Sequence, residues 1–163
     1  IARAIGREAQ AEGPAAAGDP KAFLDATVEE FMALRDDPQL GELVGCPELQ
    51  KLLSCAGEQK EACWNWRSEK LQVEGSLRAR GEKYNGYPCS RGYFGSYCID
   101  GLSIALWCFY NTTSFMEAVV RSANFLGDAD TNAAIAGQLA GAFYGFGAID
   151  ERLLGELEKW DNL

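Results

Sequence analysis

The stretch Gly127–Gly145, GDADTNAAIAGQLAGAFYG, decides how this chain folds. Two aspartates and a threonine stand at its start, and no charged residue follows from Asn132 to Ile149. An uncharged run of this length, rich in alanine and glycine, predicts a helix buried in the middle of the fold. The polar start of the run would then lie where this helix emerges from the core.

The oxygen-bearing groups at the start of this helix belong to Asp128, Asp130 and Thr131. Asp128 and Thr131 are three residues apart, which places them on one face of a helix, and Asp130 lies between them. Carboxylates and hydroxyls are the ligands that Mg²⁺ and Mn²⁺ prefer. Aspartates at this position also satisfy free N–H groups and complement the helix dipole without any metal. The spacing alone leaves both interpretations open.

Small residues recur at every fourth position of this run, at Ala133, Gly137, Gly141 and Gly145. Each glycine inside a helix costs roughly 0.8–1 kcal/mol relative to alanine, so we expect another segment to approach this face closely. Paired membrane helices use similar spacing. The run is barely long enough to cross a bilayer, however, and it contains Asn132 and Gln138, so we predict a buried helix and no membrane span.

Helical patterns extend along much of the remaining chain. Asp19 followed by Pro20 is typical of a helix start, and apolar residues recur at helical spacing as far as residue 35. Pro47 begins a shorter helix. Further helices are predicted within YCIDGLSIALWCFYN, within SFMEAVVRSANFLG, where Thr113 and Ser114 form the cap, and over residues 150–160.

The domain organisation follows from these patterns and from the length. Residues 64–92 are rich in glycine, serine and charge, and they predict a long irregular loop that is locally basic. No segment alternates between apolar and polar residues, so strands are not expected. We therefore predict one all-α domain over residues 1–163, an orthogonal bundle of helices.

Composition excludes several classes of function. With 15 Lys and Arg against 24 Asp and Glu the net charge is −9, so we expect no nucleic acid as the main partner. The chain has no histidine, which removes every Ser/His/Asp or Cys/His catalytic arrangement. Its six cysteines form no C-x-x-C pair and are more typical of reduced thiols. No secretory signal is visible, so we expect an intracellular, reducing location, cytoplasmic or organellar.

The run from Ser96 to Gly145 resembles the C-terminal part of the ADP-ribosylglycohydrolase family, whose members include the dinitrogenase reductase-activating glycohydrolases and the J1 crystallins. The residues that carry the resemblance are the G-D-x-D-T start at Gly127, the glycine-rich helix after it, and A-L-W at residues 105–107. The resemblance implies an all-helical fold of this type. It also implies hydrolysis of the glycosidic bond between ADP-ribose and a protein or small-molecule acceptor.

The resemblance further implies a pair of Mg²⁺ ions, with Mn²⁺ as an alternative, and it maps metal ligands onto Asp128, Asp130 and Thr131. The family takes its other metal ligands and its catalytic carboxylate from an N-terminal half that has no counterpart in residues 1–90. We therefore expect this chain to be the C-terminal portion, completed by a missing N-terminal segment or a second chain. The first residue, Ile1, favours a processed or trimmed chain. The alternative is a catalytically inactive structural or assembly subunit, a pseudoenzyme that keeps the fold.

Two further features have open interpretations. A turn with two glycines stands before a core helix, where it could meet a substrate or simply lead into the helix; its residues are Gly92, Tyr93, Phe94, Gly95 and Ser96. Asp100 is either a carboxylate that supports the metal ligands or a first-turn residue that complements the helix dipole. The sequence assigns no catalytic residue.

Overall fold

The computed structural model describes residues 18–55, 62–80, 94–125 and 127–161, and all regular structure in these ranges is helical. This confirms the all-α prediction. The α-helices are α2 (Pro20–Ala33), α3 (Gly41–Val44), α4 (Pro47–Ser54), α5 (Val73–Arg80), α6 (Cys98–Tyr110), α7 (Phe115–Ala123), α8 (Ala129–Tyr144) and α9 (Glu151–Asp161). Short 3₁₀ helices are η2 (Leu34–Asp36), η3 (Ala62–Trp64) and η5 (Phe146–Ala148).

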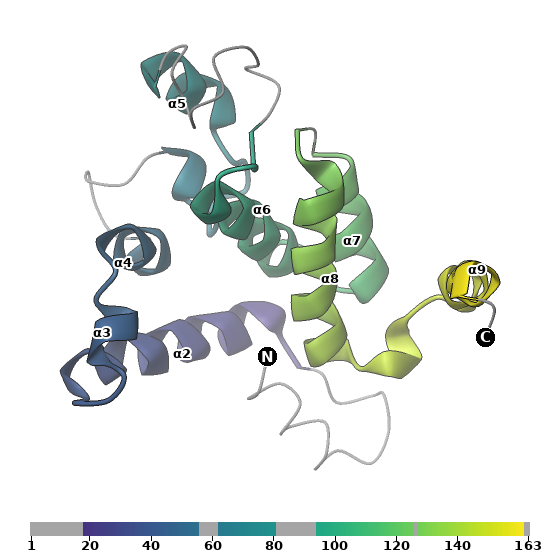
Figure 1. Ribbon diagram of the computed structural model, residues 1–163, viewed down its shortest axis with the longest axis horizontal. Coiled ribbons are helices and arrows are strands. Elements are labelled where there is room, and N and C mark those ends of the chain that lie inside the picture. The colour runs from purple at the N-terminus through teal and green to yellow at the C-terminus, as the bar shows by residue number, and fades with distance from the viewer. Residues whose placement is uncertain (1–17, 56–61, 81–93, 126, 162–163) are drawn as a thin grey trace.

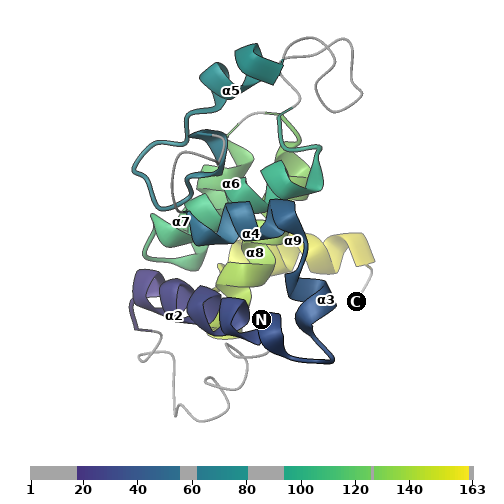
Figure 2. The same ribbon diagram turned by 90° about the vertical axis from the view of Figure 1, so that its left-hand side faces the viewer.

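Helix α8 stands at the centre of the arrangement (Figure 1). Helix α7 lies alongside it, α6 packs across it, and α2 and α5 lie toward opposite ends of the molecule (Figure 2). The core includes Ile104 and Phe109 of α6 with Ala140 and Phe143 of α8. The Phe143 ring also lies 4.9 Å, between centroids, from the ring of Phe23 in α2. Three helices therefore share one apolar centre.

Two of the predicted helix starts are confirmed in detail. Asp19 caps α2 by accepting a hydrogen bond from the Lys21 backbone N–H at 3.0 Å. Ser114 caps α7 by accepting from the Glu117 backbone N–H at 3.2 Å. The Glu117 carboxylate in turn accepts the Thr113 backbone N–H at 2.9 Å, and this bond is the main reason that its pKa is lowered. Such reciprocal caps fix where a helix begins.

The predicted loop over residues 64–92 is wrong in part, because α5 forms within it over Val73–Arg80. Glycine and serine at positions 75 and 76 obscure the helical pattern in the sequence. The helix is supported by Val73 and Leu77, which lie one turn apart and pack against the core, and by an ion pair between Glu74 and Arg78 at 3.1 Å. Tertiary contacts have overridden a weak local preference.

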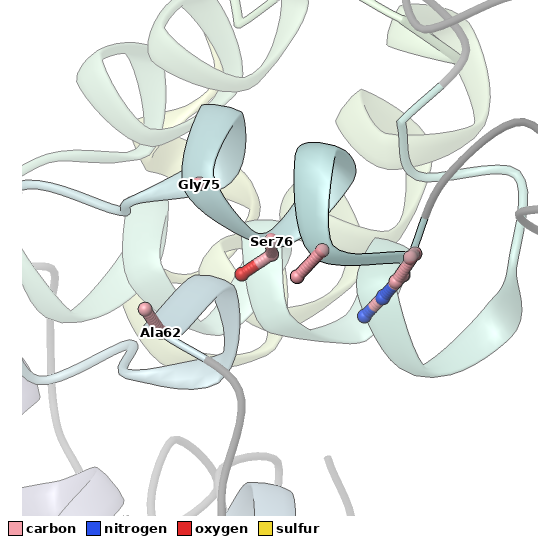
Figure 3. Close-up of a pocket in the computed structure, with 5 residues that line it drawn as sticks. Ala62, Gly75 and Ser76 are labelled. Carbon is pink, nitrogen blue, oxygen red and sulfur yellow. The ribbon is translucent and has the colours of Figure 1, made fainter.

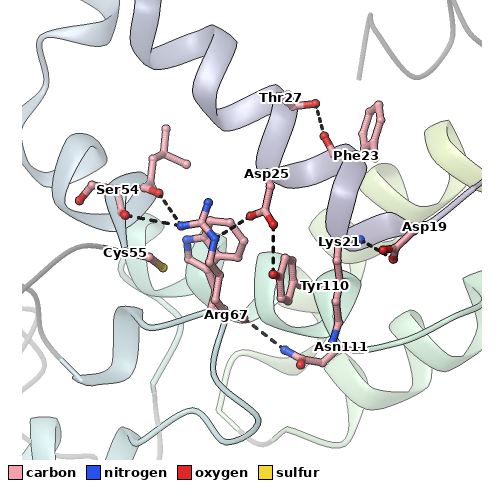
Figure 4. Close-up of polar contacts among 12 residues, drawn as sticks. Asp19, Lys21, Phe23, Asp25, Thr27, Ser54, Cys55, Arg67, Tyr110 and Asn111 are labelled. Atoms are coloured by element: carbon pink, nitrogen blue, oxygen red, sulfur yellow. Dashed lines mark hydrogen bonds and ion pairs between the residues drawn. The ribbon is translucent and has the colours of Figure 1, made fainter.

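A polar cluster joins α2, α4 and α6 (Figure 4). The Asp25 carboxylate accepts from Arg67 Nε at 2.7 Å and from the Tyr110 hydroxyl at 3.2 Å. The Arg67 guanidinium also lies over the Trp66 ring, 4.1 Å from its centroid, and donates to the Leu53 carbonyl at 3.4 Å. This cluster ties the first described helix to the rest of the bundle.

The glycine stripe of α8 faces α7. A Cβ added at Gly137 would lie 3.6 Å from Val119 Cγ2, and one added at Gly141 would lie 3.6 Å from Phe115 Cε2. Both distances are ordinary van der Waals contacts, so α7 leaves room for a methyl group at either position. Gly145 has a different place, since it follows the last residue of α8 and its φ of 83° favours glycine.

We expect Gly137→Ala to raise the free energy of unfolding by about 0.8–1 kcal/mol, because alanine gains helix propensity without a clash. Urea unfolding monitored by circular dichroism measures the change. Gly145→Ala is the control and should instead destabilise the chain, because its backbone conformation disfavours a side chain. Destabilisation by Gly137→Ala would mean that some other segment lies closer to this face than α7 does.

Helix α9 differs from the others in lying away from the body of the molecule (Figure 1). Its apolar residues Leu153, Leu157 and Trp160 are exposed, and Trp160 is 85% exposed. None of the helices in the described ranges has the length and apolar character needed to cross a membrane. Within those ranges Cys46 and Cys98 are exposed, and Cys63 and Cys108 are buried. Burial raises the pKa of the Cys108 thiol to about 12.

Candidate functional site

The candidate site lies at the N-terminal end of α8, where the sequence predicts metal ligands. Asp128 occupies the cap position, but its side chain makes no capping hydrogen bond. Only its backbone carbonyl continues the helix, accepting the Asn132 backbone N–H at 3.0 Å. Asp128 is partly buried, whereas Asp130 and Thr131 are exposed. The capping interpretation therefore does not account for the Asp128 carboxylate.

The two carboxylates of the site influence each other. Asp130 Oδ1 accepts the Thr131 backbone N–H at 2.9 Å. This bond, and a side-chain hydrogen bond with Asp128, lower the pKa of Asp130. An ionised carboxylate beside a second carboxyl and a hydroxyl group is a centre of negative charge open to solvent. A small divalent cation would neutralise such a centre.

The turn at Phe94–Ser96 packs directly against this end of α8. The Phe94 carbonyl accepts the Asp128 backbone N–H at 3.3 Å. The close approach depends on Gly127, whose φ is 77° and where an added Cβ would lie only 2.1 Å from the Phe94 oxygen. Residues far apart in the sequence are thus held together at the start of the motif.

The structure brings only part of the predicted substrate turn to the site. Gly95 and Ser96 lie in this turn, while Gly92 and Tyr93 lie outside the described residues. Phe94 is 3% exposed, and its ring packs near that of Phe125, with ring centroids 6.4 Å apart. Phe94 and Gly95 are both buried, and Ser96 is partly exposed.

Asn132 is a residue of this region that sequence reasoning missed. It follows Asp128 by one helical turn and is fully buried, and neither polar atom of its side chain has a hydrogen-bond partner in the described structure. It lies against two glycines, Gly95 of the turn and Gly101 of α6. The available signal was its position four residues after Asp128, as a polar residue in a run of alanine and glycine.

Asp100 is a buried structural carboxylate behind this region. Its oxygens accept from Arg80 Nη1 at 2.7 Å, from Arg80 Nη2 at 3.0 Å and from Trp64 Nε1 at 2.7 Å. Asp100 is fully buried, and the Arg80 side chain is 14% exposed. The partners come from η3 and α5, so Asp100 does more than complement the dipole of α6. The next residue, Gly101, contacts Asn132.

A cavity of about 410 Å³ lies between η3 and α5, lined by Ala62, Gly75, Ser76, Ala79 and Arg80 (Figure 3). Its walls are mostly small side chains. Among these five lining residues the charged one is Arg80, and it forms an ion pair with Asp100. None of these five residues belongs to the predicted metal or substrate set.

The chemistry of the donors at the start of α8 fits a hard divalent cation. The groups are all oxygens, two are carboxylates, and Asp128 and Asp130 are close enough to interact. Within the described ranges, no three His, Cys, Asp or Glu side chains gather as a metal site would require. The residues present thus offer part of a coordination shell, and a complete site needs further ligands.

Comparison with known proteins gives relatives of one kind. The chain is 40% identical over 67 residues to ADP-ribosylarginine hydrolase Tri1 of Serratia proteamaculans, which is 41% of this chain and 18% of that protein. It is 51% identical over 49 residues to ADP-ribosylarginine hydrolase Tri1 of Pseudomonas putida, 30% of this chain and 13% of that protein. It is 37% identical over 71 residues to ADP-ribosyl-[dinitrogen reductase] glycohydrolase of Rhodospirillum rubrum, which is 44% of this chain and 23% of that protein.

The matched part thus spans less than a quarter of the length of each of these curated relatives. No solved structure matches the chain significantly. The family model for ADP-ribosylglycohydrolase, by contrast, matches residues 1–163, the full length of the sequence. With that match over a helical bundle whose G-D-x-D-T residues stand together at the start of its central helix, the chain belongs to the ADP-ribosylglycohydrolase family.

Proposed function

We propose that this chain carries one half of a Mg²⁺-dependent site that hydrolyses the glycosidic bond between ADP-ribose and an acceptor. In this reaction the bond from the ribose anomeric carbon to the acceptor breaks, the carbon takes the hydroxyl of water, and the acceptor takes its proton. The observation that supports the proposal most is the open oxygen cluster of Asp128, Asp130 and Thr131 in a chain of this family.

Asp128 and Asp130 would hold the cation through their carboxylates, with the Thr131 hydroxyl beside them. A bound Mg²⁺ supplies charge that orients ribose hydroxyls and polarises a water molecule. The chain contributes a fixed helix end for this purpose, because Gly127 and the Phe94 carbonyl hold the start of α8 against the turn. Of the described turn residues, the partly exposed Ser96 would lie beside the ligand. The remaining metal ligands and the general acid or base would come from a further segment or a second chain.

The acceptor is proposed from the relatives. Two of them are named as hydrolases of ADP-ribosylarginine, and a third as acting on ADP-ribosyl dinitrogen reductase. We therefore propose ADP-ribosylated protein as the substrate class, with an arginine linkage as the first to assay.

The experiment that tests this function is thermal unfolding of the chain with ADP-ribose and Mg²⁺, separately and together. Ligands that bind only the folded state stabilise it, so at a hundredfold excess over Kd we expect the melting temperature to rise by roughly 5–10 °C. Asp130→Ala should abolish the rise. Glu158→Ala removes an exposed carboxylate on α9 and should leave it unchanged. A rise that does not require Mg²⁺, or that survives Asp130→Ala, would contradict the proposal.

A second candidate function is an inactive structural or assembly subunit. It is favoured by the exposed apolar residues beyond α8, namely Phe146 at 70%, Leu157 at 59% and Trp160 at 85% exposure. A subunit of this kind would give no ligand-dependent stabilisation and would instead associate through this surface. The same unfolding experiment, combined with sedimentation analysis of oligomeric state, separates the two candidates.

A further inference from the structure

Asn132 is buried in a way that calls for a hydrogen-bond partner. Its side chain is fully buried, and both Nδ2 and Oδ1 lack a partner among the described residues. Buried polar atoms in proteins are almost always paired, because a buried group without a partner loses its bonds to water and gains nothing. An apolar side chain of the same size would avoid this cost. The presence of an amide here therefore points to a hydrogen bond that the described residues do not make in this arrangement.

Two other segments of the fold make space for this amide. A Cβ at Gly95 would lie 2.3 Å from Asn132 Nδ2, and a Cβ at Gly101 would lie 2.9 Å from Asn132 Oδ1. Any side chain at either position would collide with the amide. The space for Asn132 thus depends on a glycine from the turn and a glycine from α6, and it lies where both meet α8.

The partner is best sought toward Asp128. Side chains in a helix lean toward its N-terminus, so a residue meets the one four positions earlier. For Asn132 that residue is Asp128, whose carboxylate makes no capping hydrogen bond. The Asp128 backbone is fixed on both sides, by its N–H to the Phe94 carbonyl and by its carbonyl to the Asn132 N–H. The Asp128 side chain has a hydrogen bond with Asp130 but none that caps the helix.

We infer that Asn132 is a positioning residue for the cation site. When a cation is bound, Asn132 Nδ2 donates to the Asp128 carboxylate and holds it in the orientation that binds the metal. Hydrogen bonds to metal-binding carboxylates from residues behind them commonly change metal affinity 10–100-fold. This inference rests on the proposed function, because it requires Asp128 to bind a cation.

The test is direct titration of the full chain with Mn²⁺, following free Mn²⁺ by electron paramagnetic resonance. Asn132→Leu replaces the amide by an apolar group of similar shape, so we expect the Mn²⁺ Kd to rise 10–100-fold. The metal-free melting temperature should stay the same or rise, because an unpaired buried amide has been removed. Gln138→Leu, at an exposed position of the same helix, should leave the Kd unchanged.

The outcomes separate this inference from the proposed function. If the wild-type chain binds Mn²⁺ and Asn132→Leu binds it within twofold of the wild-type Kd, Asn132 is not a positioning residue and the proposed function stands. If the wild-type chain takes up no Mn²⁺, both fail. Asn132→Ser keeps a hydrogen-bond donor in a smaller side chain. Its Mn²⁺ Kd should lie between those of the wild-type chain and Asn132→Leu. If Asn132→Leu does not fold, a serine variant with unchanged Kd overturns the inference.

Discussion

Asp100→Ala is expected to lower the free energy of unfolding by about 3–5 kcal/mol, the usual cost of removing one partner from a buried ion pair. The substitution leaves the Arg80 guanidinium, now 14% exposed, without its carboxylate, and leaves Trp64 Nε1 without its acceptor. Because Asp100 joins η3 and α5 to α6, we also expect α5 to lose protection against amide hydrogen exchange. Urea unfolding measures the global change, and exchange measures the local one.

The matched control for Asp100 lies on the same helix as its partner. Glu74 and Arg78 of α5 form an ion pair whose side chains are 84% and 65% exposed. Glu74→Ala should therefore change stability by less than about 1 kcal/mol, as expected for exposed pairs. A double-mutant cycle of Asp100 and Arg80 should give strong coupling. A loss below about 1 kcal/mol for Asp100→Ala would show that the buried pair contributes little.

Gly127→Ala is expected to destabilise the chain by about 2–5 kcal/mol. Part of the cost is conformational, because Gly127 has a φ of 77°, in the left-handed region that alanine disfavours. The remainder is overlap, since the new Cβ would fall 2.1 Å from the Phe94 carbonyl oxygen. That oxygen belongs to the backbone, so relief requires the whole turn to move away from α8. Chemical denaturation measures the loss.

Two substitutions separate the causes in the Gly127 prediction. Gly147→Ala, where an added Cβ meets nothing within 4 Å, should change stability by about 0.5 kcal/mol or less. Gly127→Asn also adds a Cβ, but asparagine tolerates the left-handed region better than alanine. Relative to Gly127→Ala it should therefore regain only the conformational part of the lost stability. Full recovery by asparagine would mean that the overlap with Phe94 does not exist.

The sequence predicted best what neighbouring residues determine. The starts of α2 and α7 follow from Asp19 with Pro20 and from Ser114, since a cap acts within one turn. Helix α8 follows from an uncharged run that is long enough to predict a buried helix. Helix α5 could not be predicted in this way, because it depends on contacts of Val73 and Leu77 with the core and of Arg80 with Asp100.

The candidate site shows the same limit more sharply. Asp128, Asp130 and Thr131 are adjacent in the sequence, so their spacing suggested a cluster. The surroundings of Asn132 could not be predicted, because Gly95 and Gly101 reach it from other segments. Nothing local in either glycine shows that an amide will lie against it. The role of Gly127 was hidden for the same reason, since its close neighbour is the carbonyl of Phe94.

The polar cluster at Asp25 has a consequence for the order in which the chain assembles. Its bond to Tyr110 joins residues 85 positions apart, whereas α7 and α8 are neighbours in sequence and share the most extensive contact among the described helices. Closing a long loop loses chain entropy before any contact is gained, and local contacts form sooner. The α7–α8 hairpin should thus form early and α2 should dock late. Mutations at Asp25 would then act mainly on the unfolding rate, leaving early folding of the proposed cation site unaffected.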